Sequence, residues 1–157
     1  MFRFSFRTRD INLVMLKKKG IEDLIFDLDN TIFSLWSKNL KREIKDLIAR
    51  AKTMGFRIYL VSNSNDFPKI SLICNELAID RLLISRSGGE VALLSSPAFF
   101  KFRIIYRGSR PKPWGLGKKL KEMGISAERA IVIGDNPFTD GLGAFLAGVS
   151  FYWVLKP

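Results

Sequence analysis

The chain has 157 residues, of which 47% are hydrophobic and 26% are charged, proportions typical of a globular domain and not of a disordered or fibrous chain. It contains no histidine and one cysteine, Cys74, which excludes Ser-His-Asp and Cys-His catalysis, histidine-ligated zinc and an internal disulfide. The 26 basic and 15 acidic residues give a formal net charge of +11, which favours anionic partners: phosphorylated substrates, nucleic acid or an anionic membrane face.

The N-terminal segment and the hydropathy of the chain bear on its location. No apolar run approaches the ~18 residues of a transmembrane helix, and MFRFSFRTRD lacks the continuous apolar segment of a secretory signal. We therefore expect a cytoplasmic protein that can bind peripherally at the inner membrane face. The alternation of Phe2, Phe4 and Phe6 with Arg3 and Arg7 fits such contact, and it fits a first strand or a docked arm equally well.

The first half of the chain predicts two strand–helix units. A short apolar run at 24–26 ends in acidic residues and reads as a buried strand, and a second strand over 56–61 ends in the polar residues 62–65. Apolar residues recur at helical spacing over 38–54 and stop at a glycine. Residues 67–78 suit a further helix, since a proline is tolerated in the first turn.

The second half continues this alternation. Helices are expected over 116–123 and 138–147, and strands over 79–84, 102–106, 130–133 and 150–155. The segment near 84–103 contains the turn signal Ser87-Gly88-Gly89 and predicts a hairpin or a surface flap, whose role stays open. Because no repeat or linker interrupts the chain, residues 1–157 are expected to form one domain that carries this insertion.

The alternation of strand and helix indicates an α/β fold, in which a parallel sheet is covered by helices on both faces. Ligands of such sheets bind at the carboxyl ends of the strands. The polar residues of interest lie there. Asp27 and Asp29 follow the first strand, Ser62 follows the second, and Asp135 follows the strand at 130–133.

These residues predict a phosphoryl-transfer site. Carboxylates separated by one residue at the end of a buried strand are costly unless a cation joins them, so Asp27, Asp29 and Asp135 predict an oxygen-ligand site for Mg²⁺. With the charge offset, Asp27 is placed to attack phosphorus and form an aspartyl-phosphate. Asp29 is placed to protonate the leaving oxygen and then to activate water. Ser62 and nearby backbone amides are placed to bind phosphate oxygens.

The motifs together resemble the haloacid dehalogenase (HAD) superfamily. Its first motif, DxDx[TV], is matched by DLDNT at 27–31; its second, a Ser or Thr that ends the next strand, by Ser62 in LVSNSN; and its fourth, GDxxxxD, by residues 134–140. The resemblance implies a HAD-like, doubly wound, Rossmann-like parallel sheet without a cap domain, because the intervals between the motifs are too short for one. It spans nearly the whole chain.

The resemblance also implies roles for individual residues. Asp27 becomes the nucleophile, Asp29 the acid/base that binds metal through its backbone carbonyl, and Asp135 a metal ligand. Asp140 becomes a supporting residue, which orients either a cation or the metal shell. The candidates for substrate binding are Thr31, Ser62 and Asn63.

The third motif, which supplies a cation opposite the nucleophile, departs from the family pattern. The expected Lys-Pro falls on Arg110, before Pro111, when the sequences are aligned without a gap. Lys112, before Pro113, restores the lysine only with a shift of two residues. Arginine can stabilise the same charge with a different geometry, so Arg110 is the first candidate for this catalytic cation and Lys112 the second.

Within the superfamily, the chain is similar to the capless subclass IIIA and to the YqeG-like family, which includes phosphatidylglycerophosphate phosphatases. The similarity rests on residues 16–32, 106–124 and 134–148. It implies a Mg²⁺-dependent phosphatase that acts on phosphatidylglycerophosphate, so that an anionic lipid head group is the expected partner. Phe99, Phe100 and their basic neighbours fit either membrane contact or ordinary packing.

Two other functions stay open at this point. One is a soluble phosphatase of the same superfamily that acts on a sugar phosphate, a nucleotide, a phosphoprotein or a nucleic-acid end, since a basic surface also fits polynucleotides. The other is a non-catalytic phosphate-binding module, as in receiver domains. There, however, the phosphorylated aspartate lies on a later strand than the acidic pair, whereas Asp27 belongs to the pair. The oligomeric state is left open.

Overall fold

The computed structural model describes residues 2–5, 10–28, 31–32, 42–62, 73, 75–77, 81–84, 89–94, 101–106 and 112–154. For 2–5, 81–84, 89–94, 101–106 and 112–113 it describes the backbone only. The expected helix over 67–78 is represented by residues 73 and 75–77, which are helical. Phe99 and Phe100 lie outside the described residues.

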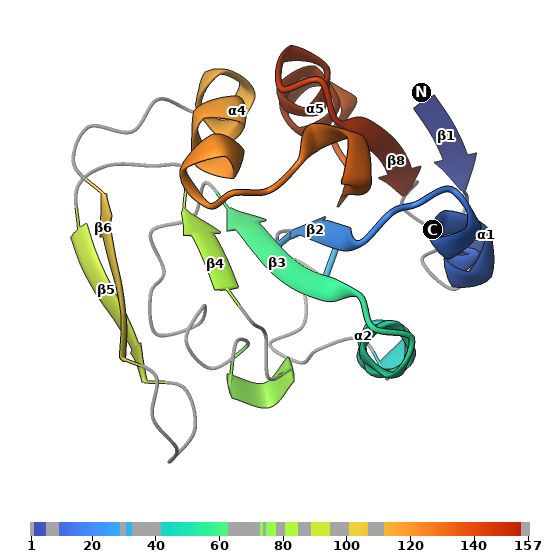
Figure 1. The fold of residues 1–157 in the computed structure, drawn as a ribbon, viewed down its shortest axis with the longest axis horizontal. Helices are drawn as coiled ribbons and strands as arrows, with labels where there is room; N and C mark the ends of the chain where they lie inside the picture. Colours follow the sequence, from blue (N-terminus) through green and yellow to red (C-terminus); the bar gives the residue numbers. More distant parts are fainter. Residues whose placement is uncertain are drawn as a thin grey trace.

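A six-stranded parallel sheet forms the centre of the fold, in the order β1-β8-β7-β2-β3-β4 (Figure 1). Its strands are β1 (Phe2–Ser5), β2 (Asp23–Asp27), β3 (Arg57–Ser62), β4 (Arg81–Ile84), β7 (Ala130–Gly134) and β8 (Ser150–Val154). The predicted parallel α/β sheet is confirmed. The N-terminal segment in which Phe and Arg alternate forms β1 over Phe2–Ser5. This strand pairs with β8 at the edge of the sheet.

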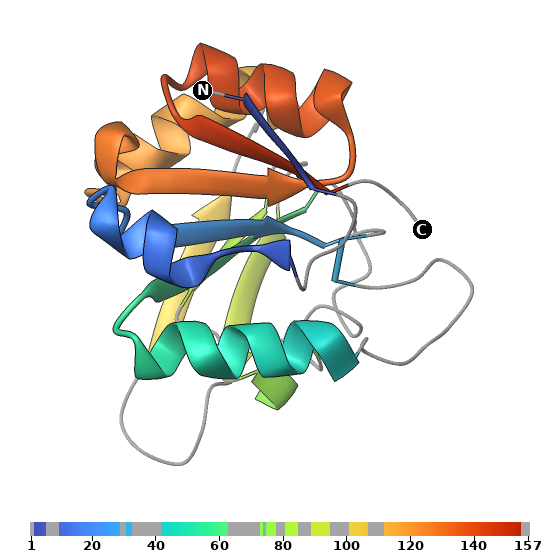
Figure 2. The same cartoon turned by 90° about the vertical axis from the view of Figure 1, so that its right-hand side faces the viewer.

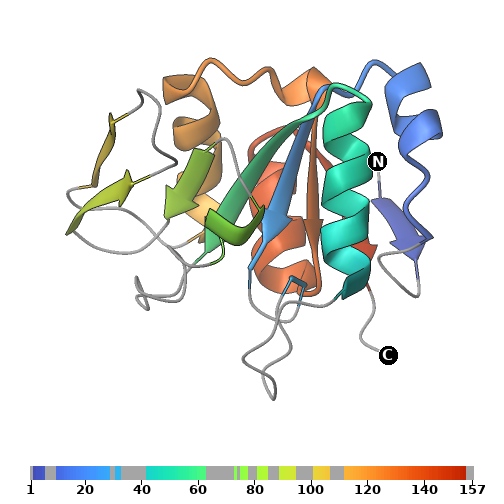
Figure 3. The ribbon, with the colours of Figure 1, turned by 90° about the horizontal axis from the view of Figure 1, so that it is seen from below.

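Helices cover both faces of this sheet (Figure 2). One face carries α1 (Leu13–Lys18) and α2 (Arg42–Thr53), which Figure 3 shows from below. The other face carries α4 (Lys112–Glu122), the π-helical turn η3 (Pro137–Gly141) and α5 (Leu142–Leu146), while the 3₁₀ turn η2 (Ala127–Arg129) leads into β7. Alternation along β2 divides the core, because Leu24 and Phe26 pack with α1 and α2, whereas Ile25 packs with α4 and α5.

Three helical segments differ from the sequence prediction. α1 was not predicted; Asn12 caps it by accepting a hydrogen bond from the backbone N of Met15 at 2.9 Å. α4 begins at Lys112 instead of residue 116, since Pro113 fits a first helical turn. The helix expected over 138–147 is a π-helical turn followed by α5, and Asn136 caps it by accepting bonds from the backbone N of Phe138 and Thr139.

Strands β5 (Gly89–Leu94) and β6 (Lys101–Tyr106) form a separate two-stranded antiparallel sheet. Their register runs without interruption from Gly89 opposite Tyr106 to Leu94 opposite Lys101. The strand expected over 102–106 corresponds to β6. None of the described helices is long and apolar enough to cross a membrane.

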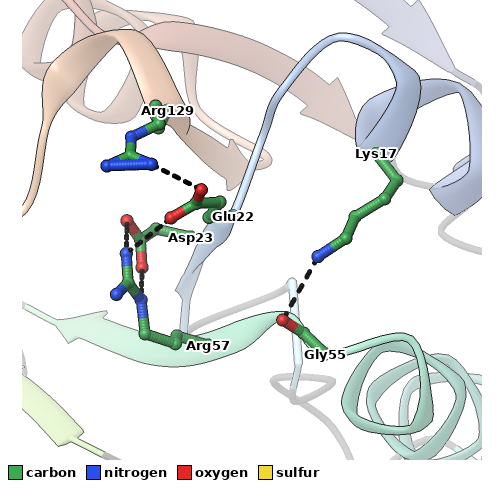
Figure 4. Close-up of polar contacts among 6 residues, drawn as sticks. All are labelled: Lys17, Glu22, Asp23, Gly55, Arg57 and Arg129. Atoms are coloured by element: carbon green, nitrogen blue, oxygen red, sulfur yellow. Dashed lines mark hydrogen bonds and ion pairs between the residues drawn. The ribbon is translucent and has the colours of Figure 1, made fainter.

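Charged side chains join β2, β3 and the turn η2 at the amino edge of the sheet, opposite the predicted site (Figure 4). The fully buried Asp23 accepts two hydrogen bonds from Arg57, one from Nε at 2.5 Å and one from Nη2 at 2.8 Å. Glu22 accepts from Arg57 at 3.2 Å and from Arg129 at 2.6 Å. The pKa of the Arg57 guanidinium is raised, chiefly by its hydrogen bond to Asp23. Nearby, Lys17 donates to the backbone O of Gly55 at 3.3 Å.

Arg57→Ala should therefore lower the free energy of unfolding by about 2 kcal/mol, because it leaves the Asp23 carboxylate buried without its guanidinium. The expected loss is below the ~3–5 kcal/mol typical of fully buried pairs, because the Arg57 side chain is 54% exposed. Urea denaturation would measure it. Arg50→Ala, on the exposed side of α2, is the matched control and should change stability by less than ~0.5 kcal/mol. Equal losses in the two variants would contradict a structural role for the network.

Candidate active site at the carboxyl edge of the sheet

Three neighbouring strands end at one edge of the sheet and bring predicted site residues together. Asp27 is the last residue of β2 and lies opposite Val61 of β3, so Ser62 follows one position further along that edge. On the other side of β2, β7 ends at Gly134, and Asp135 follows it directly. Asp135, Asp27 and Ser62 therefore lie at the ends of three adjacent parallel strands, as the sequence predicted for ligand-binding residues.

Asp27, Asp135 and Asp140 form an acidic cluster. Each offers a carboxylate oxygen, and these oxygens all lie within 4.8 Å of one another. Asp27 is 5% exposed and Asp140 is 1% exposed, while Asp135 is half-buried. Three carboxylates so close and so poorly solvated repel one another, which favours a bound cation.

Asp140 enters this cluster because of the π-helical turn η3. Its carboxylate accepts a hydrogen bond from the backbone N of Asn136 at 3.2 Å and one from the hydroxyl of Thr139 at 3.4 Å. The backbone N of Asp140 donates to the carbonyl of Asn136 at 2.8 Å, which closes the turn. The loop thus holds the Asp140 side chain against the end of β7. The prediction gave Asp140 only a supporting role, and the structure places its carboxylate beside those of Asp27 and Asp135.

Gly134 makes room for the Asp140 carboxylate. A Cβ added to Gly134 would lie 2.7 Å from Cγ of Asp140 and still closer to its Oδ2. Atoms without a covalent bond cannot approach so closely, so the carboxylate rests where any other residue would carry a side chain. This gives a physical reason for the glycine of the Gly-Asp motif at the end of β7.

Two further residues hold the acidic residues in place. The hydroxyl of Thr31, which is fully buried, lies 3.5 Å from Oδ2 of Asp27 and donates a long hydrogen bond to it. The indole Nε1 of Trp153 donates to the backbone carbonyl of Asp135 at 3.1 Å. Trp153 could not be predicted from the sequence, since this contact depends on the pairing of β8 with β7, which sets Trp153 opposite Gly134.

The remaining predicted site residues are not placed. Asp29, Asn63 and Arg110 fall outside the described residues. Lys112 is the first residue of α4, and only its backbone is described. The choice between Arg110 and Lys112 as the third-motif cation therefore stays a prediction.

The donor set of the acidic cluster fits a hard divalent cation. Its ligand atoms are carboxylate oxygens, and the chain contains no histidine and only one cysteine. Oxygen donors suit Mg²⁺ and similar ions, which use a few carboxylates and fill their remaining positions with water or phosphate oxygens. The structure therefore offers a site for a divalent cation between the ends of β2 and β7.

Comparison with known proteins points to one family. A family model described as haloacid dehalogenase-like hydrolase matches residues 33–148. The chain is 26% identical over 128 residues to "Probable phosphatase YqeG" of Bacillus subtilis (strain 168), and 28% identical over 134 residues to "Phosphatidylglycerophosphate phosphatase 1, chloroplastic/mitochondrial" of Arabidopsis thaliana. These matches cover 82% and 84% of this chain but only 60% and 34% of the two relatives.

Solved structures share the fold. A haloacid dehalogenase-like hydrolase from Brucella suis 1330 superposes with a TM-score of 0.61 over 91% of each chain, at 14% sequence identity. At this identity the likeness shows the fold alone. It agrees with the parallel sheet and flanking helices described above.

Proposed function

Because the chain belongs to the haloacid dehalogenase-like hydrolases, we propose that it is a phosphomonoester hydrolase with Asp27 as its nucleophile. The observation that carries this proposal is the acidic cluster of Asp27, Asp135 and Asp140, with Ser62 at the end of the neighbouring strand. Acidic residues at loop starts are common, but three carboxylates gathered this closely, two of them buried, favour a bound cation. With a cation, the set becomes a site for phosphate.

The reaction divides into two displacements on phosphorus. A carboxylate oxygen of Asp27 attacks phosphorus, the bond to the leaving oxygen breaks, and Asp29 donates a proton to that oxygen. Asp29 then accepts a proton from water, which attacks phosphorus and releases phosphate and the Asp27 carboxylate. Thr31 holds one oxygen of Asp27 during these steps. The expected metal is Mg²⁺, which Asp27, Asp135 and the backbone carbonyl of Asp29 would hold and which would neutralise charge on the phosphate.

Other residues bind the phosphate. Ser62 ends β3 and Asn63 is the next residue in the sequence, and both would donate to phosphate oxygens. The cation of the third motif, Arg110 or Lys112, would balance the charge that develops on the transferring group. Neither step requires a cysteine or a histidine, in agreement with the composition.

The proposed substrate is phosphatidylglycerophosphate. Two observations support a phosphate on an anionic lipid: the similarity to a relative named for that activity, and a net charge of +11, which favours anionic surfaces. The same charge favours phosphorylated ends of nucleic acids, which makes a soluble phosphatase of this family the second candidate.

A comparison of substrates tests this proposal. With Mg²⁺, we expect kcat/KM for phosphatidylglycerophosphate in mixed micelles to exceed that for soluble esters by about tenfold or more, a difference of ~1.4 kcal/mol in transition-state binding. The soluble panel holds a sugar phosphate, a nucleotide, a phosphopeptide and a 5′-phosphorylated oligonucleotide. EDTA should abolish turnover of all of them.

Other results of this comparison would contradict parts of the proposal. A soluble ester preferred by a comparable factor would overturn the lipid substrate and leave a soluble phosphatase. Failure to turn over any phosphate ester, with phosphate still bound, would indicate a phosphate-binding module. Turnover that persists in EDTA would contradict the metal-dependent mechanism.

A further inference from the structure

Large apolar side chains face solvent along η3 and α5. Phe138, Leu142, Phe145 and Leu146 are 82%, 39%, 69% and 52% exposed. Their spacing of i, i+4, i+7 and i+8 is that of one face of a helix, and a surface helix ordinarily turns such a face toward the core. Here the buried residues are Asp140, which belongs to the acidic cluster, and the small residues Gly141, Gly143 and Ala144. The amphipathic pattern of this segment is therefore reversed.

α4 extends this surface. The two helices lie side by side on the same face of the sheet (Figures 1 and 2), and a Cβ added to Gly117 would lie 3.3 Å from Cα of Ala147. Trp114 precedes Gly117 by about one turn on the same side of α4 and is 60% exposed. We name Trp114 together with Phe138, Leu142, Phe145 and Leu146 the α5 patch. A contiguous group of exposed aromatic and aliphatic residues marks an interaction site.

The charges around the α5 patch are mainly basic. Residues 137–148 contain one charged residue, Asp140, and that residue is buried. Lys118 and Lys121 are exposed and follow Trp114 by one and two helical turns, on its side of α4. Lys118 also pairs with the exposed Glu122 at 3.8 Å. The chain as a whole carries a net charge of +11. Two such chains would repel each other, whereas an anionic surface would attract one.

We propose that the α5 patch docks the protein peripherally onto an anionic lipid bilayer. Aromatic and leucine side chains beside lysines are the composition of helices that lie in the membrane interface, where the apolar face enters the head-group boundary and the lysines contact anionic lipids. Neither α4 nor α5 is long enough to cross a bilayer. The bilayer is favoured over a second copy of the chain because of the like charge of two copies.

The α5 patch adjoins the candidate active site along the chain. Phe138 lies in η3 between Asp135 and Asp140, two members of the acidic cluster. A docked patch therefore holds the cluster beside the layer of lipid head groups. A catalytic role for docking rests on the proposed function. The binding of the patch to lipid does not depend on that function.

Vesicle sedimentation tests the docking. The intact chain should partition onto vesicles of phosphatidylglycerol and phosphatidylcholine more strongly than onto phosphatidylcholine alone. Phe145→Ser/Leu146→Ser should lower the partition coefficient about tenfold or more, and Phe145→Ser alone should have an intermediate effect. The matched control is Val14→Ser, a residue of α1 that is 55% exposed on the opposite face of the sheet, and it should bind like the wild type.

Independent readouts separate docking from folding and from catalysis. Circular dichroism and the melting temperature should show that the double variant folds, and it should hydrolyse a soluble aryl phosphate at the wild-type rate. Equal partitioning of the double variant and the wild type would overturn the proposal, as would equal binding of the wild type to neutral vesicles. The proposal would also be overturned if the wild type formed a dimer and did not bind vesicles, and if the double variant lost that dimer. The patch would then be an interface with a second copy of the chain. Vesicle binding without any phosphatase activity would support docking and contradict the proposed function.

Discussion

Asp27→Asn should lower kcat for a soluble aryl phosphate on the order of 10⁴-fold or more, since the residual rate after loss of a nucleophile comes from binding alone. The amide cannot form the acyl-phosphate bond that the carboxylate forms. Steady-state kinetics in Mg²⁺ would measure the loss. Asp46→Asn, an exposed aspartate of α2, is the matched control and should keep wild-type activity. Full activity of the Asp27 variant would contradict the covalent mechanism.

The same variant should report on the electrostatics of the cluster. Without a divalent ion, Asp27→Asn should be at least as stable as the wild type, because it removes one of three carboxylates whose oxygens lie within 4.8 Å. Mg²⁺ should raise the melting temperature of the wild type and raise that of the variant less, since a ligand that binds the native state stabilises it in proportion to its affinity. A variant less stable than the wild type in EDTA would show that Asp27 holds the fold and not a metal.

The sequence predicted the parts of the fold that depend on local pattern. Buried runs such as Leu24-Ile25-Phe26 and the acids that follow them are enough to place strand ends, and parallel strands bring those ends to one edge. For this reason Asp27, Ser62 and Asp135 could be assigned to one site from the order of residues along the chain. The helical spacing of α2 is equally local, and the expected and observed helices agree over Arg42–Thr53.

The features that the sequence did not predict depend on contacts between distant segments. Asp23 meets Arg57 only through the pairing of β2 with β3, and Trp153 reaches the carbonyl of Asp135 only through the pairing of β8 with β7. Strand register is a property of the assembled sheet, and spacing along the chain does not reveal it. The reversed polarity of α5 was missed for a related reason: helical spacing shows that apolar residues share a face but not which way that face points.

The position of Asp140 falls between these two cases. The Gly-Asp motif placed Asp140 near the site, but its distance from Asp27 depends on η3, a π-helical turn that ordinary helical spacing does not predict. The hydrogen bonds from Asn136 and Thr139 then set the direction of its carboxylate. This arrangement is possible because Gly134 has no side chain.

Gly134→Ala should consequently lower kcat on the order of 10²-fold, because displacement of the Asp140 carboxylate misplaces the acidic cluster by about an ångström. The new Cβ would lie 2.7 Å from Cγ of Asp140. The backbone of Gly134 does not have a positive φ, so alanine is compatible with it and only the collision is unfavourable. We expect a loss of about 1–3 kcal/mol in the free energy of unfolding, as for other overpacked sites.

A double-mutant cycle distinguishes this collision from an ordinary effect of replacing a glycine. Asp140→Gly removes the side chain that alanine would strike, so the stability lost in Gly134→Ala should be largely recovered in the double variant, with a coupling energy of about 1–2 kcal/mol. The effect of Mg²⁺ on the melting temperature should not be recovered, since the double variant lacks one carboxylate of the cluster. Additive stability changes would show that Gly134 and Asp140 do not contact each other, and that the glycine serves the strand alone.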